Sequence, residues 1–274
     1  GEMSVSGGVN VTLKMGKPGS GTTAPGANNT SRSIGADRDV TFTGGGELDN
    51  GTTFSVSTTT NDDLGVSNSI VTITTPSMGS FTLGASTGSA SYAYDEEVPV
   101  AYEQVSDVIT TTANIIGNYM DNNGVMYTAP AMEFMGAGVQ AHLGYVLQAS
   151  DDTVADGSQP DYSATWGKGY EAGVTVTYDA LKVGIYGAER ENKTPNASTG
   201  QQITDEFNGV WYATYSFGPV SIGYSESYLD SGVVGTAEAT DAAKTLRTAA
   251  GYFQGQQMSI AFNVNENFSV SYTE

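Results

Sequence analysis

The residues of this chain that could do chemistry are mostly carboxylates. The segment 89–122 has no Lys or Arg and carries a run of acids: Asp95, Glu96, Glu97, Glu103, Asp107 and Asp121. Carboxylates gathered beside water in a narrow space attract cations and repel anions. Solvation of an external loop is the simpler alternative, since most charge runs do only that.

Calcium is the second chemistry that carboxylates allow. The adjacent acids Asp62–Asp63 and Asp151–Asp152 are candidate Ca²⁺ ligands, while Asp95–Glu96–Glu97 does not match the EF-hand spacing. Calcium takes about six to eight oxygen ligands from a defined loop. Plain solvation is again the alternative, so Ca²⁺ is the one cofactor to test.

Other kinds of site are poorly supported by the composition. The 274 residues include no Cys and one His, His142, which excludes thiolate catalysis, Cys-based metal sites and multi-His sites. The formal charge of −20 argues against nucleic acid as a partner, because phosphate binding needs clustered Lys and Arg. With no Ser-His-Asp set in view, we expect no enzyme.

The elements that must position these residues are strands. Apolar and polar residues alternate along many runs, beginning with Met3, Val5, Val9, Val11, Leu13 and Met15. Strict alternation is typical of strands with one apolar and one polar face. We count roughly thirteen such runs, many close to the ~9–11 residues that cross a bilayer at a tilt. The chain is therefore predicted to be all-β.

Connections between the runs alternate in length. Short turns are expected at 48–51, 76–79, 129–136, 178–181, 217–219 and 265–267. Long polar segments separate them at 16–33, 61–67, 89–122, 149–168, 189–206 and 230–255. A membrane barrel has short turns at one end and long loops at the other, whereas a soluble sandwich has no reason to. We predict a single antiparallel transmembrane β-barrel domain over residues 1–274.

In this order of connections, the chain resembles the Gram-negative general diffusion porins, particularly the alphaproteobacterial type. Weaker local similarities are Ser31–Arg32–Ser33, the run from Asp39 to Gly44 and the run from Asn123 to Thr128. The resemblance implies a passive, water-filled channel for small polar solutes in the cell outer membrane. It also implies that 89–122, after the fifth strand, folds into the lumen as the constriction loop.

The resemblance further implies about sixteen strands and a homotrimer, with loop 61–67 in the position of a latch that reaches a neighbour. Outer-membrane lipid and lipopolysaccharide would surround the barrel. The sequence given stops after Tyr272–Thr273–Glu274. We expect roughly three further C-terminal strands, on the order of 60 to 90 residues.

Strand parity predicts what faces the pore. With Val40 and Phe42 outward, Asp37 and Asp39 turn inward and Arg38 does not, while Lys14 has inward parity on the first strand. Porins of this family usually carry Arg and Lys on these strands. We therefore expect a cation-preferring pore lined by Asp37, Asp39, Lys14, Asp95, Glu96, Glu97, Glu103 and Asp107.

Aromatic residues near strand ends are expected to form girdles at the headgroup level. The candidates are Tyr145, Tyr178, Tyr186, Trp211, Tyr212, Tyr215, Tyr224 and Tyr228. His142 has lumen parity and is expected to be a polar residue of the pore wall. Two alternatives remain open: a secreted β-rich surface-layer or adhesin-like protein, and a substrate-specific channel.

Overall fold

The computed structural model describes residues 1–16, 31–61, 64–85, 90–102, 116, 124–149, 166–193, 202–234 and 252–274. They form one large antiparallel sheet, one small sheet and one turn of 3-10 helix, η1 (Ala90–Ala93). The strands of the large sheet are β1 (Glu2–Gly16), β2 (Ser31–Glu47), β3 (Thr53–Thr60), β4 (Val66–Thr75), β5 (Gly79–Ala85), β6 (Gly124–Thr128), β7 (Met132–Phe134), β8 (Ala137–Val146), β9 (Trp166–Tyr178), β10 (Leu181–Asn192), β12 (Glu206–Phe217), β13 (Val220–Asp230), β15 (Tyr252–Asn265) and β16 (Phe268–Thr273). The small sheet pairs β11 (Gln202–Ile203) with β14 (Val233–Val234).

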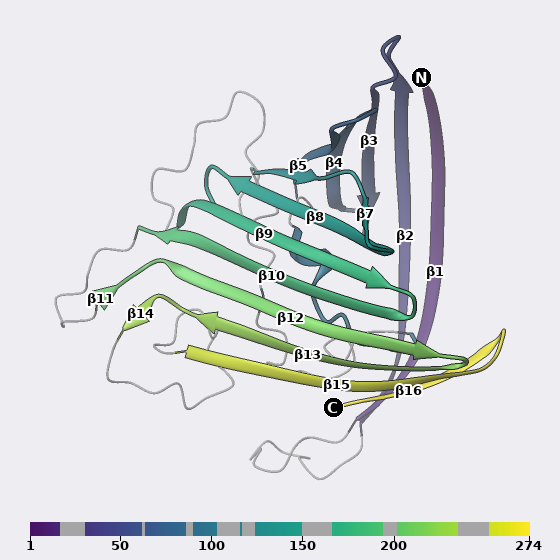
Figure 1. Cartoon of the computed structure of the whole chain (residues 1–274). Helices are drawn as coiled ribbons and strands as arrows, with labels where there is room; N and C mark the ends of the chain where they lie inside the picture. The colour runs from purple at the N-terminus through teal and green to yellow at the C-terminus, as the bar shows by residue number, and fades with distance from the viewer. Residues whose placement is uncertain are drawn as a thin grey trace.

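The order of strands in the large sheet follows the chain. Each strand on its path pairs antiparallel with the next, and β7 pairs with β8 beside that path. The sheet bends, so that β1 to β4 stand upright at one side while β8 to β15 slant across the view (Figure 1). The expected all-β class and the count of roughly thirteen strands are confirmed. Within the described residues β1 and β16 are the ends of the path, and the expected further strands stay a prediction.

The connection 129–136 differs from the prediction, which had no strand in it. The segment 129–136 contains β7, whose Met132 and Phe134 pair with Val139 and Ala137 of β8. Met135 and Gly136 make the turn, with φ of 53° and 83°. Two successive residues with positive φ give the hairpin turn whose twist matches its strands. Our expectation of a connection without a strand was therefore wrong.

Five of the six long connections are also shorter than expected, because strands extend into 16–33, 61–67, 149–168, 189–206 and 230–255. Strand β10 continues to Asn192 and β9 begins at Trp166, so regular pairing extends into both 189–206 and 149–168. Polar residues in these runs misled the prediction, since a strand of a pore wall can be polar on one face along its whole length.

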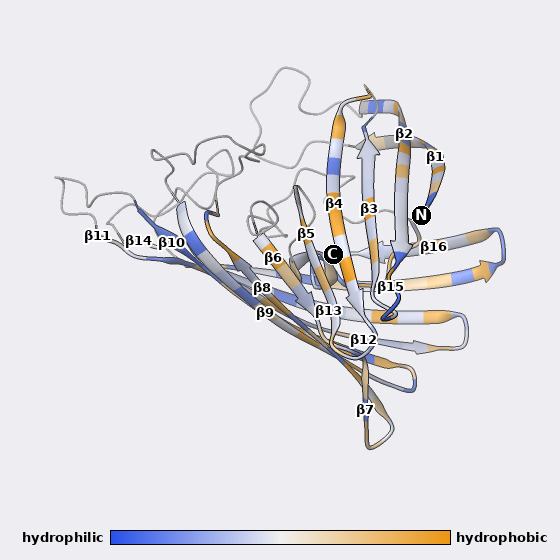
Figure 2. Cartoon of the chain, turned by 90° about the horizontal axis from the view of Figure 1, so that it is seen from above, coloured by the Kyte–Doolittle hydropathy of each residue, from blue (hydrophilic) through white to orange (hydrophobic). Residues whose placement is uncertain are grey.

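The pairing register assigns each residue to a face. Val5 lies opposite Phe42, and Ser6 opposite Thr41, so apolar residues of β1 and β2 share one face and polar residues the other. We call the face covered by residues 90–102 the inner face, and the other the outer face. Figure 2 shows hydrophobic and hydrophilic residues following one another along the sheet, most clearly on β4.

The outer face of the first strand is exposed and apolar. Each of the following is at least 60% exposed: Met3, Val5, Val9, Val11, Leu13 and Met15. A large exposed apolar surface marks contact with a membrane or a partner. No helix among the described residues is long and apolar enough to cross a membrane.

The buried cluster lies on the inner face instead of between two sheets. It contains Ala90, Tyr94, Ile116, Val146, Ala149, Tyr186, Ala188, Val210 and Tyr212. Its members come from β8 and the residues just after it, from β10 and β12, and from the segment that follows β5. The sheet is thus packed from inside by its own chain, and that packing positions the candidate site.

Candidate functional site

Residues 90–102, which we call the inner segment, cross the inner face from one strand to the next. At its start, the backbone N–H of Ala90 donates to Oε1 of Glu171 on β9 at 2.7 Å. Near its end, the N–H of Ala101 donates to Ser271 Oγ on β16 at 2.9 Å. This described part of the 89–122 loop therefore lies inside the curved sheet, as the family resemblance implied.

Tyr94 is the most deeply held residue of the inner segment. Its side chain is fully buried, and its hydroxyl lies 2.8 Å from Nδ1 of His142. Its ring stacks on Tyr186 with centroids 5.3 Å apart, and Tyr186 OH donates to Glu171 at 2.8 Å. Burial raises the pKa of Tyr94 to about 12, so its phenol stays neutral at physiological pH.

These contacts revise two expectations for aromatic residues. Tyr186 and Tyr212 are 4% and 0% exposed on the inner face, so they do not belong to an outer girdle as we expected. Their parity is opposite to that of the exposed Ile185 and Trp211, and this difference could have been read from the sequence. His142 has the expected lumen parity and, in addition, bonds to Tyr94.

The remaining girdle candidates lie on the outer face. Trp211 contacts Tyr224 with ring centroids 5.2 Å apart, and Tyr145 contacts Tyr170 at the same separation. The carboxylate of Glu226 lies on this face as well. Tyr224 OH donates to it at 3.1 Å, and Tyr228 OH and the amide of Gln254 also donate to it. Such donors allow a charge to lie among the aromatic residues.

The acids of the inner segment differ in what they face. Glu97 Oε2 forms an ion pair with Lys182 Nζ of β10 at 2.6 Å. Glu96 is 6% exposed and accepts from Nε2 of Gln257 on β15 at 3.2 Å, so its carboxylate faces the sheet instead of open water. Asp95 is half-buried. Glu103 and Asp107 lie outside the described residues.

The opposite wall is formed by the inner face of β1 to β4, which we call the open wall. No described residue of these four strands is buried. The register places Asp37 opposite Asn10 and Asp39 on the same face, with Lys14 opposite Ser33, as strand parity predicted. Neighbouring hydroxyls bond across the strands, with Thr41 and Thr59 2.8 Å apart and the Thr74 and Ser80 pair at the same distance.

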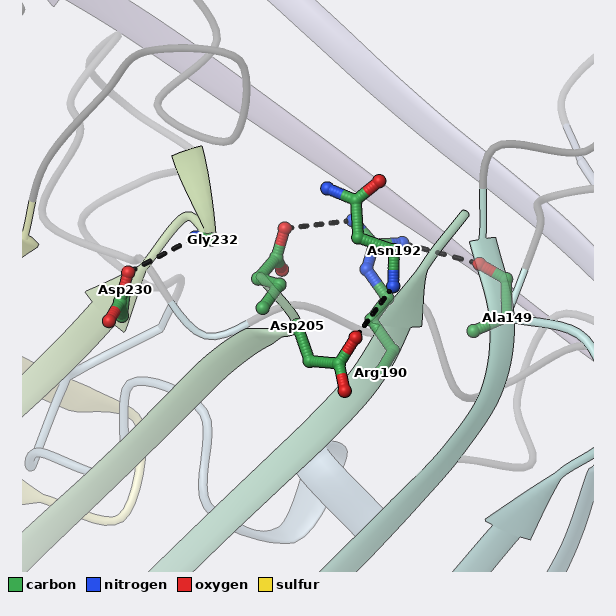
Figure 3. A network of polar contacts seen from close by, with 7 residues as sticks. Ala149, Arg190, Asn192, Asp205, Asp230 and Gly232 are labelled. Atoms are coloured by element: carbon green, nitrogen blue, oxygen red, sulfur yellow. Dashed lines mark hydrogen bonds and ion pairs between the residues drawn. The ribbon is translucent and has the colours of Figure 1, made fainter. Parts of the chain in front are cut away.

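The covered wall is the inner face of β8 to β16. In its described residues this wall carries two basic side chains, Lys182 and Arg190. The Nη2 atom of Arg190 lies 3.1 Å from Oε2 of Glu206, and both of these side chains are almost completely buried (Figure 3). Arg190 also donates to the carbonyl of Ala149 at 3.2 Å and lies 3.5 Å above the ring of Trp166. This pair was not predicted from the sequence, because its partners lie on different strands, β10 and β12.

No cation site is assembled by the described residues. They contain no group of three His, Cys, Asp or Glu side chains that could hold a metal ion. The candidate calcium ligands Asp62, Asp63, Asp151 and Asp152 lie outside the described residues. A calcium ion held by those acids therefore stays a prediction.

A curved antiparallel sheet with its own chain folded onto the inner face is the geometry of a pore with a constriction. The sequence matches the Gram-negative porin family over residues 2–273. The chain belongs to this family. It is a passive channel of the outer membrane, built as a transmembrane β-barrel. A search of curated protein sequences gave no match.

Solved porin structures share the fold at low sequence identity. The anion-selective porin from Comamonas acidovorans is 16% identical with a TM-score of 0.58, covering 99% of this chain and 78% of that one. A porin refined at 1.8 Å is 15% identical with a TM-score of 0.53, covering 99% and 93%. OmpTdeltaL8, a loop deletion mutant of an outer membrane protein of Vibrio cholerae, is 11% identical with a TM-score of 0.50 and the same coverage. At these identities the likeness shows the fold alone.

Proposed function

We propose that this porin passes small cations in preference to anions. The observation that carries the proposal is an imbalance of ion pairing between the two walls. Lys182 and Arg190, the inner-face bases described on β8 to β16, are each held by a carboxylate. Asp37 and Asp39 form no ion pair within the described part of the chain.

The carboxylates of the open wall matter because of where they lie. Asp37 is exposed and Asp39 half-buried on the open wall, so both are in contact with the water of the passage. A cleft lined by one sign of charge, with low-dielectric walls, concentrates the opposite ion. The neighbouring Thr and Ser hydroxyls are neutral, and Lys14 is the one base that the register places on this face of the described strands β1 and β2, against the two aspartates.

Fold alone does not decide selectivity. The porin from Comamonas acidovorans is anion-selective and has a similar fold. Selectivity must therefore come from the side chains that line each passage, and the comparison of charged pairs in this chain favours cations.

The test is the reversal potential of the purified porin in a planar bilayer under a KCl gradient. We expect a potential toward the potassium equilibrium value. In Asp37→Asn/Asp39→Asn the cation-over-anion permeability ratio should fall about twofold or more, since a unit charge ~4 Å away is worth ~1 kcal/mol even in water. Asp49→Asn, in the β2–β3 turn, removes a similar charge outside the wall and is the matched control. A wild-type potential of the opposite sign would overturn the proposal.

We also propose that the porin assembles as a homotrimer surrounded by outer-membrane lipid and lipopolysaccharide. The exposed apolar outer face of β1 supports burial against lipid or a neighbouring copy. The expected latch, 61–67, begins with a turn in which the N–H of Asn61 donates to the carbonyl of Gly65 at 2.8 Å. Crosslinking in mild detergent that traps only monomers would refute the trimer.

A further inference from the structure

The inner segment meets the covered wall at two positions where the wall has no side chain. Gly173 of β9 lies beneath Tyr94, and Gly223 of β13 lies beneath Pro99. A Cβ atom at either glycine would come closer than 3.0 Å to the ring of the residue above it. Both glycines therefore act as sockets, one for each ring.

Neither ring is free to move aside. The ring of Tyr94 stacks on Tyr186, meets His142 edge-on with centroids 5.7 Å apart, and is hydrogen-bonded through its hydroxyl. Pro99 has a fixed φ, and its carbonyl accepts from Ser259 Oγ of β15. Close-packed interiors respond to one added methyl by shifting the neighbouring backbone.

We propose that Gly173 and Gly223 set the width of the passage, by fixing how far the inner segment stands out from the covered wall. A side chain in either socket would lift the segment toward the open wall by on the order of 1 Å. This inference rests on the proposed function, since the passage must conduct ions for its width to be read. The width of the passage is then controlled by two glycines of the wall as well as by the residues of the loop.

The open wall provides a matched control. Gly8 of β1 occupies an inner-face position, and a Cβ atom there would meet nothing within 4 Å. Gly8→Ala is the same chemical change on the same face of the same sheet, without a socket. Any cost to strand pairing that glycine replacement has in general would appear in this variant as well.

The experiment compares single-channel conductance in KCl for Gly173→Ala, Gly223→Ala and Gly8→Ala. We expect each socket variant to lose roughly 10–30% of the wild-type conductance and the control to keep it, because conduction follows the dimensions of the narrowest section. Heat-modifiable migration in gels shows that each barrel is folded. Unchanged conductance in both folded socket variants would overturn the inference.

A second variant separates a displaced segment from a damaged strand. Adding Tyr94→Leu to Gly173→Ala replaces the ring with a smaller side chain where the socket is filled, so conductance should rise from that of Gly173→Ala alone.

A disulfide test reports independently whether the inner segment lies on β16: the Ala101→Cys/Ser271→Cys variant is oxidised. A folded, conducting barrel that never forms this disulfide would refute the inference and leave the channel function standing. Failure of the wild type to conduct would instead refute the proposed function.

Discussion

The two walls of this porin are built on different principles. The covered wall, β8 to β16, has buried polar side chains, two ion pairs and a segment of chain packed on it. The open wall, β1 to β4, has no buried residue in the described part and shows hydroxyls and carboxylates to the passage. We propose from this comparison that one wall holds the inner segment in place while the other selects ions.

The largest effect should come from breaking the buried ion pair of the covered wall. Glu206→Gln removes the carboxylate charge that lies 3.1 Å from the buried guanidinium of Arg190, and breaking a buried ion pair costs about 3–5 kcal/mol. We expect the barrel to lose its heat-modifiable gel migration at a clearly lower temperature. Glu189→Gln, at an exposed position of β10, should cost well under ~1 kcal/mol. Equal melting of both variants would mean that the pair is not a structural element.

Removing the ring of Tyr94 should release the inner segment without unfolding the barrel. Truncating a buried aromatic residue costs about 3 kcal/mol or more, and here the cost falls on docking of the segment. We expect Tyr94→Ala to have a larger or noisier single-channel conductance with unchanged gel mobility. Tyr92→Ala, a half-exposed tyrosine of η1, is the control. A stable conductance equal to that of the wild type would argue against the division between the walls.

Alkaline pH should weaken the same docking. The pKa of Tyr94 is raised to about 12, above the unfolded value of 10.0, so the docked state binds the proton more tightly. Its contribution is therefore complete below pH 10 and is lost as pH rises from 10 to 12, at about 1.4 kcal/mol per pH unit. Conductance noise should stay flat up to pH 10 and then rise. Tyr94→Phe should lack this dependence, and a rise already at pH 8 would contradict the assignment.

Freeing a carboxylate of the covered wall should have the smallest effect. Lys182→Gln removes the partner of Glu97, whose charge then reaches the passage. The cation-over-anion ratio should increase about two- to threefold, within the ~1 kcal/mol of a charge pair in water. Lys168→Gln, exposed on the outer side of β9, should leave the reversal potential unchanged. A lower ratio in Lys182→Gln would show that Glu97 does not face the passage.

Much of the open wall was predictable because the facing of its residues depends on alternation within single strands. Alternation placed Val40 and Phe42 outward and Asp37 and Asp39 inward, and the register agrees. These assignments follow from the period along the chain, which needs no knowledge of distant contacts. The inward fold of 89–122 was instead implied by the resemblance to the porin family.

The covered wall could not be predicted in the same way. Tyr94 meets His142, 48 residues later, and Ala90 meets Glu171, 81 residues later. In the sequence, Gly173 is a residue that lowers the stability of a strand. The ring of Tyr94 packed against it explains why a side chain does not fit there. Parity could have assigned Tyr186 and Tyr212 to the interior, but it does not state what they pack against.

One pair of measurements tests the division of the walls most directly. Conductance and reversal potential should be recorded together for Asp37→Asn/Asp39→Asn and for Tyr94→Ala. We predict that the aspartate variant changes mainly the reversal potential and that the tyrosine variant changes mainly the conductance. If the aspartate variant keeps the wild-type reversal potential while Tyr94→Ala abolishes the preference for cations, selection belongs to the covered wall and the account is wrong.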